Sequence, residues 1–155
     1  MKHTAKILWK KQKQEKFIDG KYSRVHIWSF DEGIEIVASS SPKVISLPMS
    51  DASTIDPEEA FLASVSSCHM LFFLSIAASQ NYCVEVYKDN VIGTMGQNKK
   101  GNIAINHIVL NPEVVFSNSK IPSLDQIEKM HQMAHSKCYL ANSIIAKIKI
   151  ISTLT

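Results

Sequence analysis

The sequence predicts an α+β fold, in which antiparallel sheets pack around a long central helix in the order βββ-α-ββ-α-β. Two observations carry this prediction. Residues 56–80 are apolar or small on nearly every face, as in one buried helix, and segments on both sides of them alternate with a period of two, as in strands. A chain of 155 residues can bury a sizeable core. We therefore expect residues 1–155 to form a single domain.

The first part of the chain predicts a three-stranded meander. Residues 4–9, 22–30 and 34–38 alternate as strands, and turn residues separate them. In the second of these strands Arg24 shares a face with aromatic side chains. Residues 39–55 contain two prolines and six serines, which indicates a loop that leads to the central helix.

The central helix has a clear start signal. Asp56 suits the N-cap, Pro57 suits the first helical position, and Glu59 follows Asp56 by three residues, close to a capping box. A helix that is hydrophobic all round is normally buried on all sides. We expect this helix to be the central rod of the fold, with Cys68 in its middle.

The second half of the chain predicts strands on either side of another helix. One strand begins near Cys83, a hairpin loop follows at residues 96–101, and a second strand at 102–116 bends near Asn111. A helix then opens with a capping box. Residues 144–152 alternate as a closing strand.

Composition excludes several classes of function. The formal net charge of +3 is small and scattered, so we expect no nucleic-acid partner. Five serines, one histidine and two glutamates interrupt the central helix, which argues against a membrane span. The N-terminus lacks an apolar segment of signal-peptide length, so we expect a cytoplasmic protein with no membrane association. The sequence indicates no cofactor.

Three cysteines, Cys68, Cys83 and Cys138, are too few for a disulfide framework. If they do more than fill core volume, they should act through reactivity. His131, His135 and Cys138 have the spacing of one helix face and could bind zinc, but histidines at the margin of a packed face explain the same spacing, and we expect no metal. No glycine-flanked nucleophile indicates a hydrolase.

Thiol redox chemistry fits the residues better. It requires a cysteine held as thiolate, a cation that stabilises the thiolate, and a second cysteine that resolves the oxidised form. Arg24 on its aromatic strand face would need an anionic partner if it is buried. Cys68 and Glu58 are the candidates for that partner.

The residues that carry this chemistry also resemble a known family. Residues 56–77, DPEEAFLASVSSCHMLFFLSIA, place Cys68 ten positions after Glu58, and residues 135–144, HSKCYLANSI, place Cys138 before a small-residue segment and the final strand. Together with YSR-x-H-x-W-x-F-D at residues 22–31, these motifs resemble the OsmC/Ohr proteins. Those proteins are bacterial thiol-dependent peroxidases that reduce organic hydroperoxides.

The resemblance implies an intertwined homodimer with two active sites at the subunit interface. It implies that Cys68 is the peroxidatic cysteine, that Cys138 is the resolving cysteine, and that Arg24 and Glu58 form the pair that stabilises the thiolate. It also implies an antioxidant role in the stress response, an organic hydroperoxide as substrate, and recycling by a dithiol reductant of the lipoyl or thioredoxin type. The alternative is a non-enzymatic OsmC-like protein that binds an apolar small ligand at the dimer interface.

Helix geometry limits how Glu58 can act. Ten helical positions correspond to roughly 15 Å, so Glu58 and Cys68 of one continuous helix cannot touch. Glu58 would reach Cys68 from an antiparallel helix of a partner subunit, or act through Arg24. The apolar helix itself also favours a dimer. A purely structural dimer with unreactive thiols and a metal protein remain open.

Overall fold

The computed structural model describes residues 1–117 and 120–154. The chain divides into two compact units, Met1–Phe61 and Leu62–Thr155, which are described separately. Two helices and small sheets form an α+β fold, as the sequence predicts.

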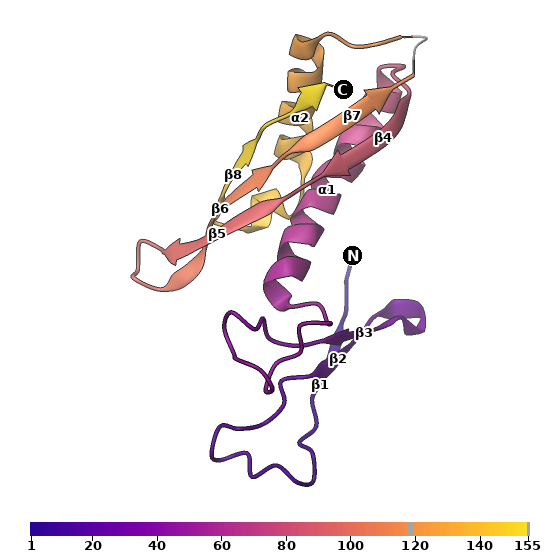
Figure 1. Ribbon diagram of the computed structural model, residues 1–155. Coiled ribbons are helices and arrows are strands. Elements are labelled where there is room, and N and C mark those ends of the chain that lie inside the picture. Colours follow the sequence, from indigo (N-terminus) through magenta and orange to yellow (C-terminus); the bar gives the residue numbers. More distant parts are fainter. Residues whose placement is uncertain (118–119, 155) are drawn as a thin grey trace. The chain divides into compact units, whose positions relative to one another are not determined.

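The first unit contains the predicted meander. Strands β1 (Lys6–Leu8), β2 (His26–Ser29) and β3 (Glu35–Ala38) pair antiparallel in the order β1-β2-β3 (Figure 1). Each strand is shorter than its sequence pattern, and β2 begins two residues after Arg24. The loop at residues 39–55 returns to the sheet, where Ile55 bridges Ala38.

Helix α1 (Pro57–Ser79) has nearly the bounds that the sequence predicts. The Asp56 carboxylate accepts a hydrogen bond of 2.8 Å from the Glu59 backbone N–H, which confirms the predicted N-cap. At the other end Asn81 adopts a φ of 59°, a left-handed conformation that stops the helix.

Burial of α1 differs from the prediction. Within the chain only one face is covered, and Leu71 on another face is 63% exposed. The expectation of burial on all sides is therefore wrong for a single copy. By length and composition alone α1 could also cross a membrane, contrary to the prediction made from its serines and charged residues, although the core helix of a globular protein meets the same criterion.

The second unit is built on three long strand regions, each divided in two. These are β4 (Val84–Asp89) with β5 (Ile92–Gln97), β6 (Ile103–Leu110) with β7 (Pro112–Phe116), and β8 (Lys147–Ile150) with β9 (Thr153–Leu154). They form two sheets of orders β4-β7-β9 and β5-β6-β8. The last strand region pairs parallel to its neighbours, while the other pairings are antiparallel.

Hydrogen bonds join the break between β4 and β5 to the break between β6 and β7. The Asn111 side chain donates to the Asn90 carbonyl at 2.8 Å, and the Asn111 backbone N–H donates to the Asp89 carboxylate at 2.6 Å. The same carboxylate accepts a short hydrogen bond from the Ser66 hydroxyl of α1. The bend that the sequence predicts near Asn111 therefore also anchors the sheet to the central helix.

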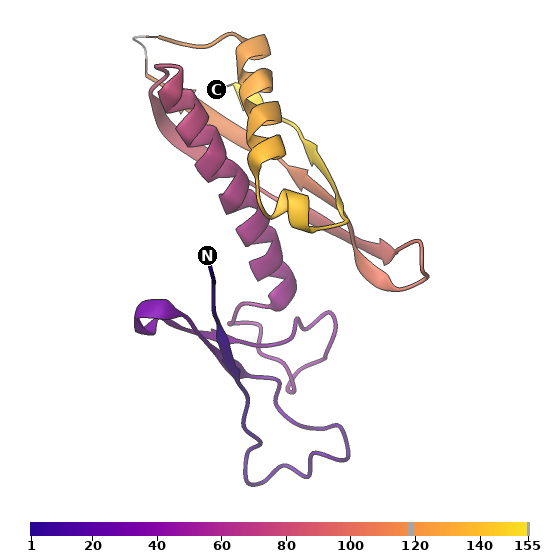
Figure 2. The same cartoon turned by 180° about the vertical axis from the view of Figure 1, so that it is seen from behind.

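Helix α2 (Leu124–Lys137) begins with the predicted capping box, in which the side chains and backbone N–H groups of Ser123 and Gln126 bond reciprocally. Within the second unit α1 and α2 lie side by side on one face of the sheets (Figures 1 and 2). The core between these layers consists of Phe73, Ile76, Ala77, Tyr82, Val114, Phe116, Ile127, Met130 and Ala134.

Close approach of α1 to β5 depends on Gly93. A Cβ atom at this position would lie 2.7 Å from Leu62 Cδ2, well inside van der Waals contact. We expect Gly93→Ala to lower the free energy of unfolding by about 1–3 kcal/mol, as overpacking does. Urea unfolding of the single variants and of Gly93→Ala combined with Leu62→Ala measures this effect. Because the second change removes the obstructing methyl groups, the double variant should lose less than the sum of the single losses; strict additivity would contradict the explanation.

Candidate functional site

Cys68 and Cys138 meet between the two helices of the second unit. Cys68 lies in the middle of α1 and is half-buried, whereas Cys138 forms the C-cap of α2 and is 0% exposed. The Cys68 side chain lies close enough to Cys138 to raise the pKa of the Cys138 thiol. The structure therefore brings together the two cysteines that the sequence singles out, 70 positions apart in the chain.

The environment distinguishes the two thiols. Burial raises the pKa of Cys138, and the neighbouring Cys68 side chain raises this pKa further. The Ala141 backbone N–H, 3.4 Å from Cys138 Sγ, opposes these effects only in part. Cys138 thus keeps its proton, and Cys68 is the more accessible sulfur.

Two aromatic rings flank the thiol pair. Phe72 follows Cys68 by one helical turn, and Tyr139 follows Cys138 directly. Their rings meet edge to face with centroids 5.2 Å apart. The third cysteine, Cys83, is exposed just before β4 and has no place in this group.

A histidine pair lies next to the thiols. His69 Nε2 and His131 Nδ1 are 3.0 Å apart, and the rings stack at an interplanar angle of 8°. His131 also stacks on Phe73, with centroids 4.2 Å apart. The two histidines are 1% and 2% exposed.

Burial keeps both imidazoles neutral. It lowers the pKa of His69 to about 4, helped by the nearby His135, and it lowers the pKa of His131 to about 3, helped by His69. The sequence analysis expected histidines at the margin of a packed face, which is wrong for His131. His69 could have been recognised as a core residue, because it lies one turn from both Val65 and Phe73 on the buried face of α1.

No metal centre accompanies these groups in the part of the chain that the structure describes. Among residues 1–117 and 120–154, no set of three or more histidine, cysteine or carboxylate side chains is arranged to hold a metal ion.

Arg24 belongs to the first unit and lies before β2 rather than within a strand. Its guanidinium stacks on the Tyr22 ring, 3.6 Å from the centroid, and donates to the carbonyl oxygens of Tyr22 and Gly20. The carbonyl oxygen of Arg24 accepts a hydrogen bond of 2.7 Å from His26 Nδ1, because a carbonyl can only accept. Backbone carbonyl groups thus fix a cation that the sequence pattern placed on a strand.

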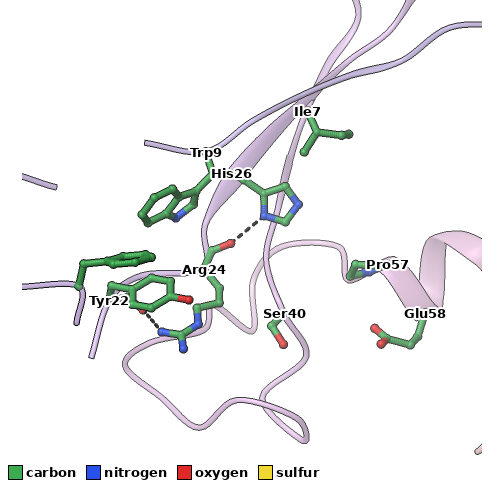
Figure 3. Close-up of a pocket in the computed structure, with 9 residues that line it drawn as sticks. Ile7, Trp9, Tyr22, Arg24, His26, Ser40, Pro57 and Glu58 are labelled. Carbon is green, nitrogen blue, oxygen red and sulfur yellow. Dashed lines mark hydrogen bonds between the residues drawn. The ribbon is translucent and has the colours of Figure 1, made fainter. Parts of the chain in front are cut away.

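Arg24 and Glu58 line one cavity of about 480 Å³ in the first unit (Figure 3). The guanidinium lies beside the Tyr22 ring, and the Glu58 carboxylate lies on the far side of Ser40. Ion pairs among the described residues join Lys88 to Glu113 and Lys129 to Asp125, so the predicted Arg24–Glu58 pair shares a cavity without direct contact. The complete lining consists of Ile7, Trp9, Phe17, Tyr22, Arg24, His26, Ser40, Pro57 and Glu58.

Three aromatic side chains form one wall of this cavity. Trp9, Phe17 and Tyr22 contact one another, with centroids 4.5 to 5.6 Å apart. Trp9 and Phe17 bracket a polar stretch that the sequence analysis treated only as a loop. Its aromatic residue, Phe17, is the signal that could have indicated a packed segment.

The chain is similar to known proteins over most of its length. The family model for OsmC-like proteins matches residues 50–153. An OsmC-like protein of unknown function from Vibrio cholerae is 48% identical, with a TM-score of 0.95, and the match covers 100% of this chain and 99% of that one. No functionally curated protein matches the chain. The chain belongs to the OsmC-like family.

More distant structures share the fold. An organic hydroperoxide resistance protein from Elizabethkingia anophelis is 14% identical, with a TM-score of 0.68, and the match covers 100% of this chain and 97% of that one. An OsmC-like protein from Mycoplasma pneumoniae is 18% identical, with a TM-score of 0.74 and coverages of 100% and 98%.

The lowered histidine pKa values make stability sensitive to acid. Unfolding returns His69 to its ordinary pKa of about 6.5. Between pH 6.5 and about pH 4, His69 therefore binds a proton in the unfolded chain but not in the folded chain. Stability is therefore full above pH 6.5 and falls as the pH drops towards 4, by about 3 kcal/mol for His69 alone. Urea unfolding between pH 7.5 and 4.5 (roughly the window of these two pKa values) measures the slope.

A pair of variants identifies the source of this slope. His69→Gln should reduce the slope and leave the contribution of His131, whereas His107→Gln, at an exposed position in β6, should leave the slope unchanged. A free energy of unfolding that does not change between pH 7 and 5 (about the steepest part of the expected curve) would exclude a neutral histidine pair.

Proposed function

We propose that this protein reduces organic hydroperoxides through a dithiol–disulfide cycle of Cys68 and Cys138. The placement of Cys68, in the middle of α1, near Cys138, at the C-cap of α2, is the observation that carries the proposal. Membership of the OsmC-like family, and a fold shared with organic hydroperoxide resistance proteins, support it.

In the first step the Cys68 thiolate attacks the distal oxygen of the hydroperoxide. A sulfur–oxygen bond forms, the oxygen–oxygen bond breaks, and the alkoxide takes up a proton and leaves as the alcohol. Cys68 is then a sulfenic acid. The Phe72–Tyr139 ring pair beside the thiols favours a substrate with an apolar group over hydrogen peroxide.

In the second step Cys138 attacks the Cys68 sulfur. The disulfide forms, the sulfur–oxygen bond breaks, and the hydroxyl group leaves with the Cys138 proton as water. An external dithiol of the lipoyl or thioredoxin type then restores both thiols by exchange. No resident cofactor is needed for this cycle.

Arg24 and Glu58 serve this chemistry from a second copy of the chain. Helix α1 is continuous from Glu58 to Cys68, so a rise of roughly 15 Å separates them along one helix. A homodimer in which the uncovered faces of α1 pack together would bring the cavity of one copy to the thiols of the other. There Arg24 would lower the pKa of the Cys68 thiol and stabilise the developing alkoxide.

The runner-up function is binding of an apolar small ligand without redox change. The aromatic wall of Trp9, Phe17 and Tyr22 is the observation that favours it. A pure binding protein would retain its ligand in a Cys68→Ser variant and would leave its thiols unchanged by hydroperoxide.

Thiol counting tests the cycle directly. After one equivalent of cumene hydroperoxide, intact-mass analysis should show loss of two thiols and about 2 Da, mapped to Cys68 and Cys138. Cys138→Ser should stop after one turnover at a sulfenic acid, about 16 Da heavier, that dimedone traps. Cys83→Ser should behave as wild type, because Cys83 is exposed outside the group. If the native protein keeps both thiols after treatment with cumene hydroperoxide, the proposed peroxidase activity is refuted.

Mixing of two variants tests whether Arg24 acts across the dimer. Arg24→Met should reduce the rate of Cys68 oxidation by about a hundredfold, as loss of one stabilising donor does. Cys68→Ser alone should be inactive. If each site combines Cys68 of one copy with Arg24 of the other, mixed dimers contain one intact site and regain activity.

The control for this experiment is Lys21→Met, which removes an exposed cation close to Arg24 in the sequence. It should leave the rate unchanged. Mixed dimers, verified by mass spectrometry, that stay inactive would place Arg24 and Cys68 of a working site in the same copy. A wild-type rate in Arg24→Met would remove Arg24 from the site altogether.

A further inference from the structure

The mechanism proposed above makes no use of the histidine pair, although the pair lies beside the thiols. His69 directly follows Cys68 in α1, and Cys138 follows His131 by seven residues, two helical turns along the same face of α2. Two pairs of side chains therefore join α1 and α2, Cys68 near Cys138 and His69 bonded to His131.

The contact between His69 and His131 lowers the stability of the fold relative to an apolar contact, so packing alone does not explain it. His69 Nδ1 and His131 Nε2 are buried and have no hydrogen-bond partner among residues 1–117 and 120–154. Each neutral imidazole has one N–H, so only one proton bridges the pair, and either arrangement leaves one N–H unbonded. An apolar pair of similar volume would avoid this cost, as replacement of buried polar pairs often shows.

A directional contact fixes position in a way that apolar packing does not. A hydrogen bond weakens steeply with misalignment, so a bond of 3.0 Å between His69 and His131 restricts sliding and rotation of α1 against α2. Stacking of His131 on Phe73 adds a second restriction. His69 is adjacent to Cys68 in α1, and Phe73 lies five residues beyond Cys68, between one and two turns along the helix.

We propose that His69 and His131 are a positioning pair that holds Cys68 and Cys138 within disulfide-forming reach. The pair thereby sets the balance between the dithiol and the disulfide. The inference deepens the proposed function and rests on it, since it takes Cys68 and Cys138 as the working thiols. A disulfide tolerates little error in the placement of its two cysteines, so a small shift of one helix weakens it.

Thiol–disulfide exchange with dithiothreitol tests this role without any hydroperoxide. The reaction converts the two protein thiols and oxidised dithiothreitol into the protein disulfide and reduced dithiothreitol. Protein is equilibrated over a range of reduced-to-oxidised ratios, quenched by alkylation, and quantified by intact mass. The equilibrium constant measures the placement of the two thiols relative to each other.

Two kinds of variant separate position from volume. His69→Gln and His131→Asn keep a polar atom near Nε2 and Nδ1 respectively, whereas His69→Met and His131→Leu keep volume but remove the hydrogen bond. We expect each apolar variant to lower the equilibrium constant for disulfide formation about tenfold, which corresponds to about 30 mV. The amide variants should stay within about threefold of wild type, by the same measure.

Ile76→Val is the control for general loss of stability. Ile76 lies in the core of the same unit and in the same helix, two turns beyond His69. It should reduce stability and leave the equilibrium constant unchanged. The His131 variants repeat the test independently if His69→Met does not fold, and the amide variants then show whether the hydrogen bond is what matters.

The outcomes separate this inference from the proposed function. Folded apolar variants with the wild-type equilibrium constant would overturn the positioning role even in an active peroxidase. An Ile76→Val variant that shifts the constant as strongly would also overturn it. Wild-type protein that forms the Cys68–Cys138 disulfide but consumes no hydroperoxide would refute the peroxidase proposal and leave the positioning role standing.

Discussion

Packing of α1 against α2 is the constraint on which the candidate site depends. Neither Cys138 nor His131 has a polar partner on its own helix that could replace Cys68 or His69, so both side chains depend on the register of the two helices. Polar groups in a low-dielectric interior are strongly penalised when they lose their partners. The packing of α1 on α2 therefore brings both pairs together at once, and the apolar core around Met130 and Ala134 supplies the energy that maintains it.

Incomplete burial of α1 links this fold to assembly. A helix with apolar side chains on every face is stable in water only if something covers them, yet Leu71 is largely exposed within one copy. In the first unit the cation at the cavity, Arg24, is held by two carbonyl oxygens and by the Tyr22 ring. In the proposed homodimer, a single interface would cover the exposed apolar side chains of α1 and supply an anion to Arg24.

Local chemistry made most of the fold predictable. Both helices begin within one residue of their expected starts because Asp56 and Ser123 are strong capping signals. The break between β4 and β5 was less visible than the bend near Asn111, because it depends on hydrogen bonds that Asn111 donates to Asp89 and Asn90, which only the folded sheet brings near. The thiols were found through a resemblance and their contact through the structure. The His69–His131 bond had no local signal, since it joins residues 62 positions apart.

Placement of the two thiols on opposite helices gives chemically identical side chains different roles. Cys138 is fully buried and its pKa is raised, which favours the protonated thiol. Cys68 is partly accessible, so in the proposed cycle it is the sulfur that an incoming oxidant would meet. Once Cys68 became a sulfenic acid, the proton kept by Cys138 would be the one needed to release the hydroxyl group as water. Burial, rather than a difference in residue type, would thus define the order of the two proposed steps.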